Sequence, residues 1–271
     1  MKLWKRDFLI LQGLANNCFS LSQIAERHFP SKMKASRRMK KLFDAGYVSR
    51  FPKPTLEIEG RAEYIYKITK KGLRALAMQG IDVNLSLYTE QKRLNAYSIQ
   101  HILFLNDIGY FFEKTMAEKQ DIECKFIYGK RFYPDGLKEH GIEPDAYLLI
   151  INRQSKKQLL HFIEIDFGSE MLESGKFGYS FEQKILKYCS YFDSNLCLND
   201  FRDFDFNGKG FRVLVVVKGR EHLTRLLQMA LEHNAGFFWF CNVDDISEDT
   251  ILGNIWCYED KGKQPLLIWS K

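Results

Sequence analysis

Residues 31–46 read SKMKASRRMKKLFDAG and have the spacing of one amphipathic helix. Four apolar residues fall on one side of that helix, where they can face a core: Met33, Met39, Leu42 and Phe43. Gly46 follows the last periodic residue, and glycine commonly ends helices because it accepts the left-handed conformation. The other side of the helix is strongly cationic.

The residues before this segment predict two further helices. Apolar residues recur at a helical spacing at Trp4, Phe8, Leu11 and Leu14. Ser20 or Ser22 can cap a short second helix over residues 23–28, which Pro30 ends because proline cannot donate a hydrogen bond to the preceding turn. We therefore expect three helices in the first 46 residues.

The residues after it predict a β-hairpin and a fourth helix. Residues 47–51 and 63–69 are β-rich, and the residues between them include prolines and Gly60. Thr69 then caps a helix that extends to about Met78. This order predicts a winged helix-turn-helix domain over residues 1–80, and residues 46–48 and 66–72 resemble prokaryotic winged-helix regulators. A linker and a bridging helix are expected over residues 81–119.

The charge of the third helix predicts DNA binding. A recognition helix needs cations for phosphates and polar side chains for base edges. The helix supplies Lys32, Lys34, Ser36, Arg37, Arg38, Lys40 and Lys41. In the hairpin, Arg50, Lys53 and Arg61 are expected to reach the DNA backbone or the minor groove. Double-stranded DNA is the expected partner, and the alternatives are a protein-binding winged helix or a solvated charged face.

Residues 120–271 predict a second domain with a mixed sheet. Five strands are expected at residues 123–128, 146–152, 159–166, 211–217 and 236–241. Helices are expected before and between them, over residues 88–119, 180–192 and 221–233. The alternation predicts an α/β domain and an α+β chain overall. The aromatic series Phe201, Phe204, Phe206 and Phe211 is expected to pack on the core, with stacking on single-stranded DNA as the alternative.

Three carboxylates are expected to converge in this second domain. Asp145 directly precedes one predicted strand, and Glu164 and Asp166 end the next. Side chains alternate along a strand with a period of two, so Glu164 and Asp166 share a face. Such a cluster repels itself unless a divalent cation such as Mg²⁺ or a basic side chain lies among the carboxylates.

The pattern resembles the PD-(D/E)xK nuclease superfamily, in which two acids hold a metal and a lysine two residues later helps to activate water. Asp166 stands at the lysine position. A displaced lysine is available at Lys184, with Tyr188 one turn later, where RecB-like members carry Gln-x-x-x-Tyr. The resemblance implies a restriction-endonuclease-like fold.

The same resemblance implies roles for individual residues. Asp145 and Glu164 would bind Mg²⁺, Glu113 would add a carboxylate, and Lys184 would stabilise the attacking hydroxide or the developing charge. Asp107 is a weaker candidate. The alternative is an ordinary strand end, with Asp145 capping a turn and Lys184 exposed.

The order of motifs along the chain resembles the replication-relaxation family. The motifs are His101 and Asn106 in the long helix, Glu143-Pro-Asp145, FIEIDFGSE at 162–170, Lys184 to Tyr191, the runs at 213–217 and 237–240, and Gly253-Asn-Ile-Trp256. The resemblance implies binding at the origin or transfer region of a plasmid or another mobile element. Partners would then include a relaxase, a transposase or a replication protein, and a homodimer is possible.

The charge, the apolar runs and the absent motifs exclude several other classes of protein. The 271 residues have a net charge of +6, without an apolar run long enough to span a membrane and without a secretory signal, so we expect a cytoplasmic protein. Phosphate-binding loops, dinucleotide fingerprints and zinc spacings are absent from the sequence. Three functions stay open: a DNA-binding accessory protein with a nuclease-like scaffold, an active Mg²⁺-dependent endonuclease, and a winged-helix regulator with an effector domain.

Overall fold

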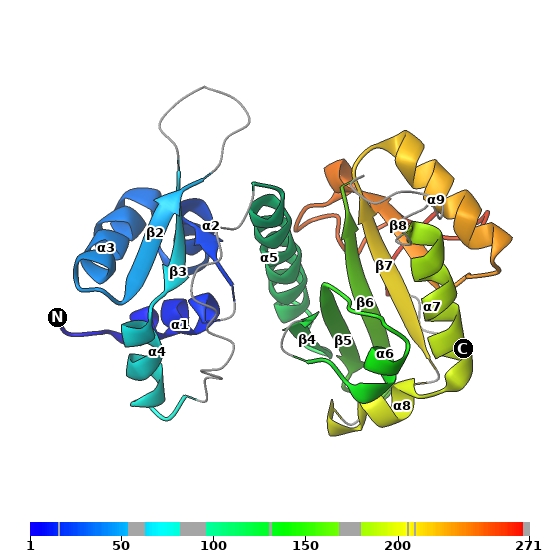
Figure 1. Ribbon diagram of the computed structural model, residues 1–271, viewed down its shortest axis with the longest axis horizontal. Helices are drawn as coiled ribbons and strands as arrows, with labels where there is room; N and C mark the ends of the chain where they lie inside the picture. Colours follow the sequence, from blue (N-terminus) through cyan, green and yellow to red (C-terminus); the bar gives the residue numbers. More distant parts are fainter. Residues whose placement is uncertain are drawn as a thin grey trace. The chain divides into compact units, whose positions relative to one another are not determined.

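The computed structural model describes residues 1–15, 17–53, 63–81, 96–129, 132–167, 180–204, 206–208 and 210–267. It forms two compact units, Met1–Asp107 and Ile108–Lys271, and each is described by itself (Figure 1). The division falls within one helix, α5 (Ala96–Ala117). The predicted domain limits at residues 80 and 120 stay predictions, because much of the segment between them lies outside the described residues.

The first unit has the winged-helix arrangement that the sequence predicts. Its elements are α1 (Lys5–Leu14), β1 (Phe19–Ser20), α2 (Leu21–His28), α3 (Lys32–Asp44), β2 (Val48–Pro52), β3 (Tyr64–Ile68) and α4 (Lys70–Ala77), followed by the first part of α5. The strands form an antiparallel sheet in the order β1-β3-β2. The short strand β1 was not predicted.

Local side chains explain where these helices begin and end. The hydroxyls of Ser20, Ser31 and Thr69 each accept a hydrogen bond from a backbone amide in the first turn of α2, α3 and α4. After α3, Gly46 has φ +76°, and its amide donates to Phe43 O while the Tyr47 amide donates to Leu42 O. This paired closure requires a left-handed residue, which explains the glycine.

The inward face of α3 differs from the prediction at three positions. Met39 and Leu42 are fully buried, as expected, but Met33 is 61% exposed. Ala35 and Arg38 are buried instead, because the positions that face the core are spaced by three and four residues from Ala35 to Leu42. Met33 falls outside that stripe.

The second unit has a central mixed sheet, again as predicted. It comprises the rest of α5, then β4 (Ile122–Tyr128), α6 (Asp135–Glu139), β5 (Ala146–Asn152), β6 (Gln158–Asp166), α7 (Phe181–Ser194), α8 (Cys197–Asp200), β7 (Phe211–Val217), α9 (Arg220–Glu232), β8 (Phe238–Asn242), β9 (Trp256–Cys257) and β10 (Lys263–Gln264). The strand order is β10-β9-β8-β7-β6-β5-β4.

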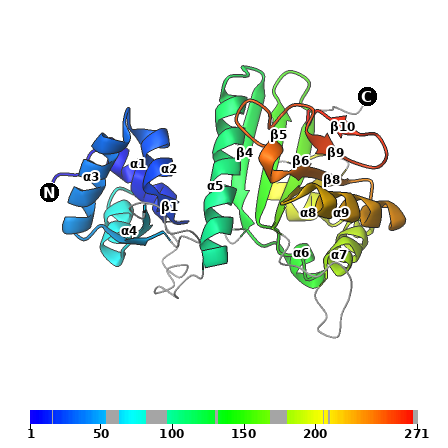
Figure 2. The same ribbon diagram turned by 90° about the horizontal axis from the view of Figure 1, so that it is seen from above.

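The strand directions determine which strand ends meet at each edge of the sheet. Strands β4, β5 and β6 form an antiparallel meander, whereas β6, β7 and β8 are parallel. Each parallel pair is joined through a helix, α7 or α9, and both helices lie on the same side of the sheet (Figures 1 and 2). This arrangement brings the first turns of α7 and α9 toward the carboxyl ends of β6 and β7.

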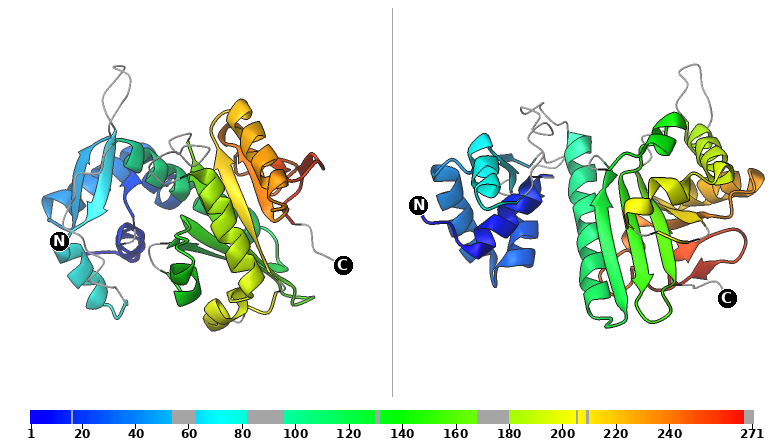
Figure 3. Two further views of the ribbon diagram at one scale, coloured as in Figure 1. Left: turned by 45° about the vertical axis from the view of Figure 1, so that its right-hand side comes forward. Right: turned by 90° about the horizontal axis from the view of Figure 1, so that it is seen from below.

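The two faces of the sheet are covered differently. A large apolar cluster joins alternate residues of β5, β6, β7 and β8 to α7 and α9, and it includes Phe201, Phe206 and Phe211, as predicted. The part of α5 in this unit covers the opposite face, along β4 (Figure 3). A Cβ at Gly109 of α5 would lie 2.9 Å from the Phe126 ring of β4, so glycine permits the close approach.

Candidate functional site

The outer face of α3 carries most of the predicted DNA-contacting residues. Six of them are exposed: Lys32, Lys34, Ser36, Arg37, Lys40 and Lys41. Lys40 pairs with Asp44 at 2.9 Å and Lys32 with Glu63 at 3.2 Å. Lys34 and Lys41 form no ion pair within the described residues, so their charge faces solvent.

Arg38 is not part of that exposed face. Its side chain is 9% exposed and pairs with the fully buried Asp7 of α1. Nε donates to Asp7 Oδ1 at 2.8 Å, Nη2 donates to Asp7 Oδ2, and the guanidinium lies 4.2 Å from the centre of the Trp4 ring. The prediction that Arg38 contacts DNA is therefore wrong, since a buried bidentate pair holds it inside the unit.

The hairpin residues are also held by the protein. The Arg50 guanidinium lies between the rings of Phe43 and Tyr64, 4.4 Å from each centre. Lys53 is half-buried, and its backbone amide donates to Glu63 O at 2.6 Å. Arg61 lies outside the described residues. Among these three residues, the structure thus gives a defined side-chain contact for Arg50, whose guanidinium stacks on Phe43 of α3.

In the second unit, Asp145 lies directly before β5 and next to the end of β6. The antiparallel pairing of β5 with β6 ends where Ala146 matches Ile163. The Asp145 amide donates to Ile163 O at 3.0 Å, and its Oδ2 accepts from the Ile165 amide at 2.9 Å. These two bonds fix the Asp145 carboxylate at the end of β6.

Gly129 completes the support of Asp145. Its amide donates to Asp145 O at 2.8 Å. A Cβ at position 129 would lie 1.8 Å from Pro144 O, so no side chain fits there without moving the backbone. The backbone at position 129 therefore approaches Pro144 so closely that only glycine fits there.

Helix α7 supplies two polar partners of Glu164. The Lys184 Nζ lies 3.3 Å from Oε2, and the Tyr188 hydroxyl donates to Oε1 at 2.7 Å. Ser180 caps α7, which puts Lys184 in the first turn and Tyr188 one turn later. Burial and the charge of Glu164 raise the pKa of Tyr188 well above its ordinary value, so the phenol stays protonated and donates.

Asp166 makes a separate pair. It lies on the same face as Glu164, is 2% exposed, and its Oδ2 is 2.8 Å from Nε2 of His222 in the first turn of α9. His222 was not predicted as a residue of this site. The sequence gives one indication of its position: His222 follows the predicted strand at 211–217 and begins a predicted helix, which places it near the carboxyl ends of the parallel strands.

Glu113 does not reach this group of residues. It is exposed on α5, and burial together with the Glu113 charge raises the pKa of Cys124 in β4 to about 12. Cys124 pairs with Ile150, which alternates with Tyr147 and Leu149 of the apolar cluster and so faces the other side of the sheet. The expectation that Glu113 adds a carboxylate beside Glu164 is therefore wrong.

The weaker candidate Asp107 lies in the first unit. Its Oδ1 accepts from the Gln23 side chain at 2.6 Å, and the same amide donates to Leu103 O at 2.7 Å. Asn106 beside it donates to Cys18 O at 2.8 Å. These bonds attach the first part of α5 to α2 and β1, which is a structural role.

The residues of the carboxylate site have the right chemistry for Mg²⁺. This ion uses one or two carboxylates together with water and substrate phosphates. Glu164 of β6 and Asp145, which accepts from the neighbouring Ile165 amide, would supply two such carboxylates. Within the described ranges, no three residues of the His, Cys, Asp and Glu types gather closely enough to form an all-protein metal cage.

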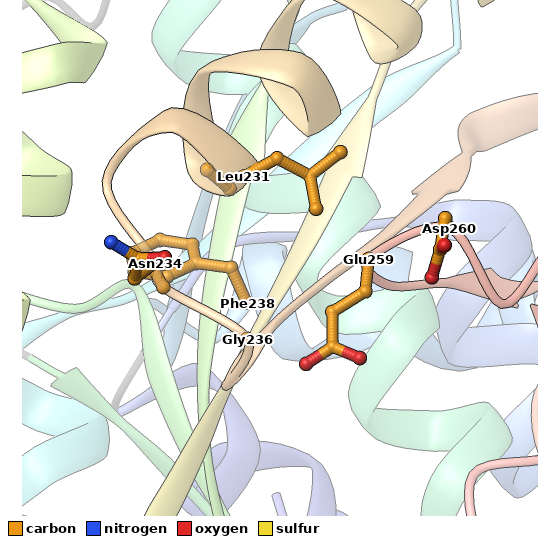
Figure 4. Close-up of a pocket in the computed structure, with 8 residues that line it drawn as sticks. Leu231, Asn234, Gly236, Phe238, Glu259 and Asp260 are labelled. Carbon is orange, nitrogen blue, oxygen red and sulfur yellow. The ribbon is translucent and has the colours of Figure 1, made fainter.

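A cleft of about 320 Å³ lies at the end of α9, away from these residues (Figure 4). It is lined by Leu231, Asn234, Gly236, Phe238, Glu259 and Asp260, among others. The Glu259 carboxylate extends toward Gly236, and with Asp260 it gives the cleft a negative wall. A polyanion would be repelled there.

In the part of the chain that the structure describes, no helix is both long and apolar enough to cross a bilayer.

Comparisons with known proteins give one family and remote likenesses to solved structures. A protein-family model described as replication-relaxation matches residues 15–200. The chain is similar to Bacillus subtilis PadR in complex with operator DNA, with 18% identity, a TM-score of 0.27, and coverage of 44% of this chain and 71% of that one. It is also similar to the MunI restriction endonuclease in complex with cognate DNA, with 17% identity, a TM-score of 0.27, and coverage of 66% and 89%. No curated protein matches.

Proposed function

This chain belongs to the replication-relaxation family, and from that premise we propose that it is a DNA-binding protein whose winged-helix unit binds double-stranded DNA. In this proposal the nuclease-like unit is a scaffold or interaction surface. The target would be an origin or transfer region of a mobile element, and the partner a relaxase, a transposase or a replication protein.

The observation that carries the proposal is the distribution of charge on α3. Lys34, Arg37 and Lys41 follow one another at intervals of three and four residues, so they form one exposed cationic stripe. The buried pair of Arg38 with Asp7 anchors the helix behind that stripe. Cations held in a row by a rigid helix are suited to phosphates spaced along a duplex.

Binding of a labelled duplex over a range of salt concentrations tests this proposal. Arg37→Ala should weaken binding and lower the slope of log K against log salt by about one, because one phosphate contact is lost. Arg225→Ala on α9, which removes an exposed arginine paired with Glu221, is the matched control and should change neither. An Arg37→Ala protein that binds with the wild-type affinity and slope would remove α3 from the interface.

A second candidate function is metal-dependent hydrolysis of a phosphodiester. It is favoured by the convergence of Asp145, Glu164 and Lys184. Bound Mg²⁺ would polarise the phosphoryl oxygen and supply a hydroxide. Asp145 and Glu164 would hold the ion, Lys184 would face the developing negative charge, and Tyr188 would fix the orientation of Glu164.

Nicking of supercoiled plasmid in Mg²⁺ separates the two functions. An active enzyme nicks the plasmid, and Asp145→Asn and Glu164→Gln abolish nicking while duplex binding persists. A crystal soaked in Mn²⁺ gives an independent measure, because anomalous density between Asp145 and Glu164 reports the ion directly. Nicking that survives in both variants would assign the activity to another site or to a contaminant.

A further inference from the structure

The winged-helix unit has a cleft that duplex binding alone does not explain. It has a volume of about 350 Å³ and lies between the residues that begin α1, the turn between α2 and α3, and the face of α3 that carries Lys34, Arg37 and Lys41. Its lining includes Trp4, Arg6, Phe29, Lys34, Arg37 and Lys41. The cationic stripe of α3 therefore forms one wall of a cleft whose other wall is aromatic.

Trp4 is the unusual member of this lining. A tryptophan normally buries its large apolar surface, yet the Trp4 residue is 52% exposed. The Arg38 guanidinium covers part of its ring, and Asp7 neutralises that guanidinium. The indole thus stays rigidly supported from one side and open to solvent elsewhere.

Most of the cations that line the cleft have no carboxylate partner among the described residues; the exception is Arg38, which pairs with Asp7. Lys34 and Lys41 make no ion pair with any described residue, and Arg37 donates only to the thioether of Met33, at 3.6 Å. Arg6 stacks on Phe29 at 4.2 Å, and its buried Nε finds no acceptor within the described part of the chain. The cleft therefore offers an open aromatic surface beside several uncompensated cations.

We propose that this cleft binds an unpaired nucleotide of DNA, with its base stacked on Trp4 and its phosphate against Arg37, Lys34 or Lys41. The proposal rests on the proposed duplex binding by α3 and names the class of DNA more narrowly. Bases inside a duplex are stacked on one another, so only an unpaired base can offer its face to an indole. The preferred ligand is then a duplex that continues into a single strand.

Continuity with α3 favours nucleic acid over an acidic peptide. The same lysines and arginine that line the cleft belong to the exposed stripe of α3, so a DNA backbone on that stripe enters the cleft directly. Stacking of one base on an aromatic side chain contributes about 1–3 kcal/mol, and a preference of roughly tenfold corresponds to about 1.4 kcal/mol.

The test compares one duplex with blunt ends and the same duplex with a 3′ or a 5′ single-stranded extension. We measure dissociation constants by fluorescence anisotropy. The wild-type chain should bind at least one of the extended forms about tenfold more tightly than the blunt form, as stacking of one base allows. Trp4→Ala should reduce the ratio of the two dissociation constants, blunt over extended, to about one. Trp4→Phe should retain part of the preference because an aromatic ring remains.

Leu9→Ala is the matched control, because Leu9 lies on α1, which begins directly after Trp4, and is 50% exposed. It should leave the ratio unchanged, and thermal melting checks that each variant folds. A wild-type ratio of one, or a Trp4→Ala ratio equal to that of the wild type, overturns the nucleotide cleft while duplex binding by α3 stands. Absence of any duplex binding overturns both proposals.

Discussion

Two ion pairs, one in each unit, both involve a nearly buried carboxylate, but they differ in the cation. Arg38 is 9% exposed, makes a bidentate pair with Asp7 and lies against Trp4. Lys184 is 25% exposed and reaches Glu164 at 3.3 Å, while Tyr188 donates to the same carboxylate. Both cations were predicted to act on DNA, and only the second has the access that such a role needs.

The difference shows how exposure separates a structural pair from an adaptable one. Removal of one partner from a closed pair leaves a charge that neither water nor another group can stabilise. In the half-open pair, solvent reaches the lysine, and Glu164 keeps a second donor. Lys184 can therefore turn toward a ligand, whereas Arg38 cannot.

The largest effect is expected from Arg38→Met. The variant leaves Asp7 buried without its cation, which should lower the free energy of unfolding by about 3–5 kcal/mol. Urea unfolding measures this loss. The double variant Asp7→Leu with Arg38→Met should recover most of it, because no uncompensated charge remains. A single variant as stable as the wild type would mean that the pair is not closed in solution.

Tyr188→Phe should have the next largest effect. The variant removes a hydrogen bond to a charged, buried acceptor, and such bonds contribute about 2 kcal/mol. Tyr147→Phe is the matched control, because the buried Tyr147 hydroxyl has no hydrogen-bond partner among the described residues and its loss should be nearly neutral. Equal losses of unfolding free energy in the two variants would show that the bond to Glu164 contributes nothing.

Lys184→Met should cost less, about 1 kcal/mol, because Glu164 keeps the Tyr188 hydrogen bond and the site is partly open to water. Lys187→Met, on the same helix, removes a bond to Gly141 O and should change stability by about 0.5 kcal/mol or less. The measurement is again urea unfolding. A loss of unfolding free energy as large as that of Arg38→Met would mean that the Lys184–Glu164 pair is as closed to solvent as the Arg38–Asp7 pair.

The smallest effect concerns salt. An increase from 0.1 to 1 M NaCl shortens the screening length from about 10 to about 3 Å. The cost of Lys184→Met should then fall by about 0.5 kcal/mol, whereas the cost of Arg38→Met should not change, because ions do not enter a closed pair. Stability curves at the two salt concentrations measure both quantities. A salt-dependent cost at Arg38 would contradict its burial.

Local signals predicted the parts of the fold that depend on neighbouring residues. Ser31 and Gly46 mark the ends of α3 because a cap acts within a few residues of the helix end. The alternation that put Glu164 and Asp166 on one face is equally local. The position of Asp145 beside the end of β6 was expected because consecutive strands often lie next to each other.

Partners that are distant in sequence were not predictable in the same way. Arg38 pairs with a residue 31 positions away, and His222 pairs with Asp166 across 56 positions. A helical pattern shows that Arg38 is cationic but not that α1 offers a buried carboxylate to it. The assignment of Glu113 failed for a related reason, since the sequence does not tell which face of the sheet α5 covers.

Gly129 has a consequence for how related sequences are compared. A Cβ at position 129 would lie 1.8 Å from Pro144 O, so a single methyl group there would displace Asp145 although every charged residue of the site is still present in the sequence. A survey that scores only the acids and the lysine would count such a protein as intact. Inheritance of the site should therefore be judged at this uncharged position as well, where loss of function can begin without any change in charge.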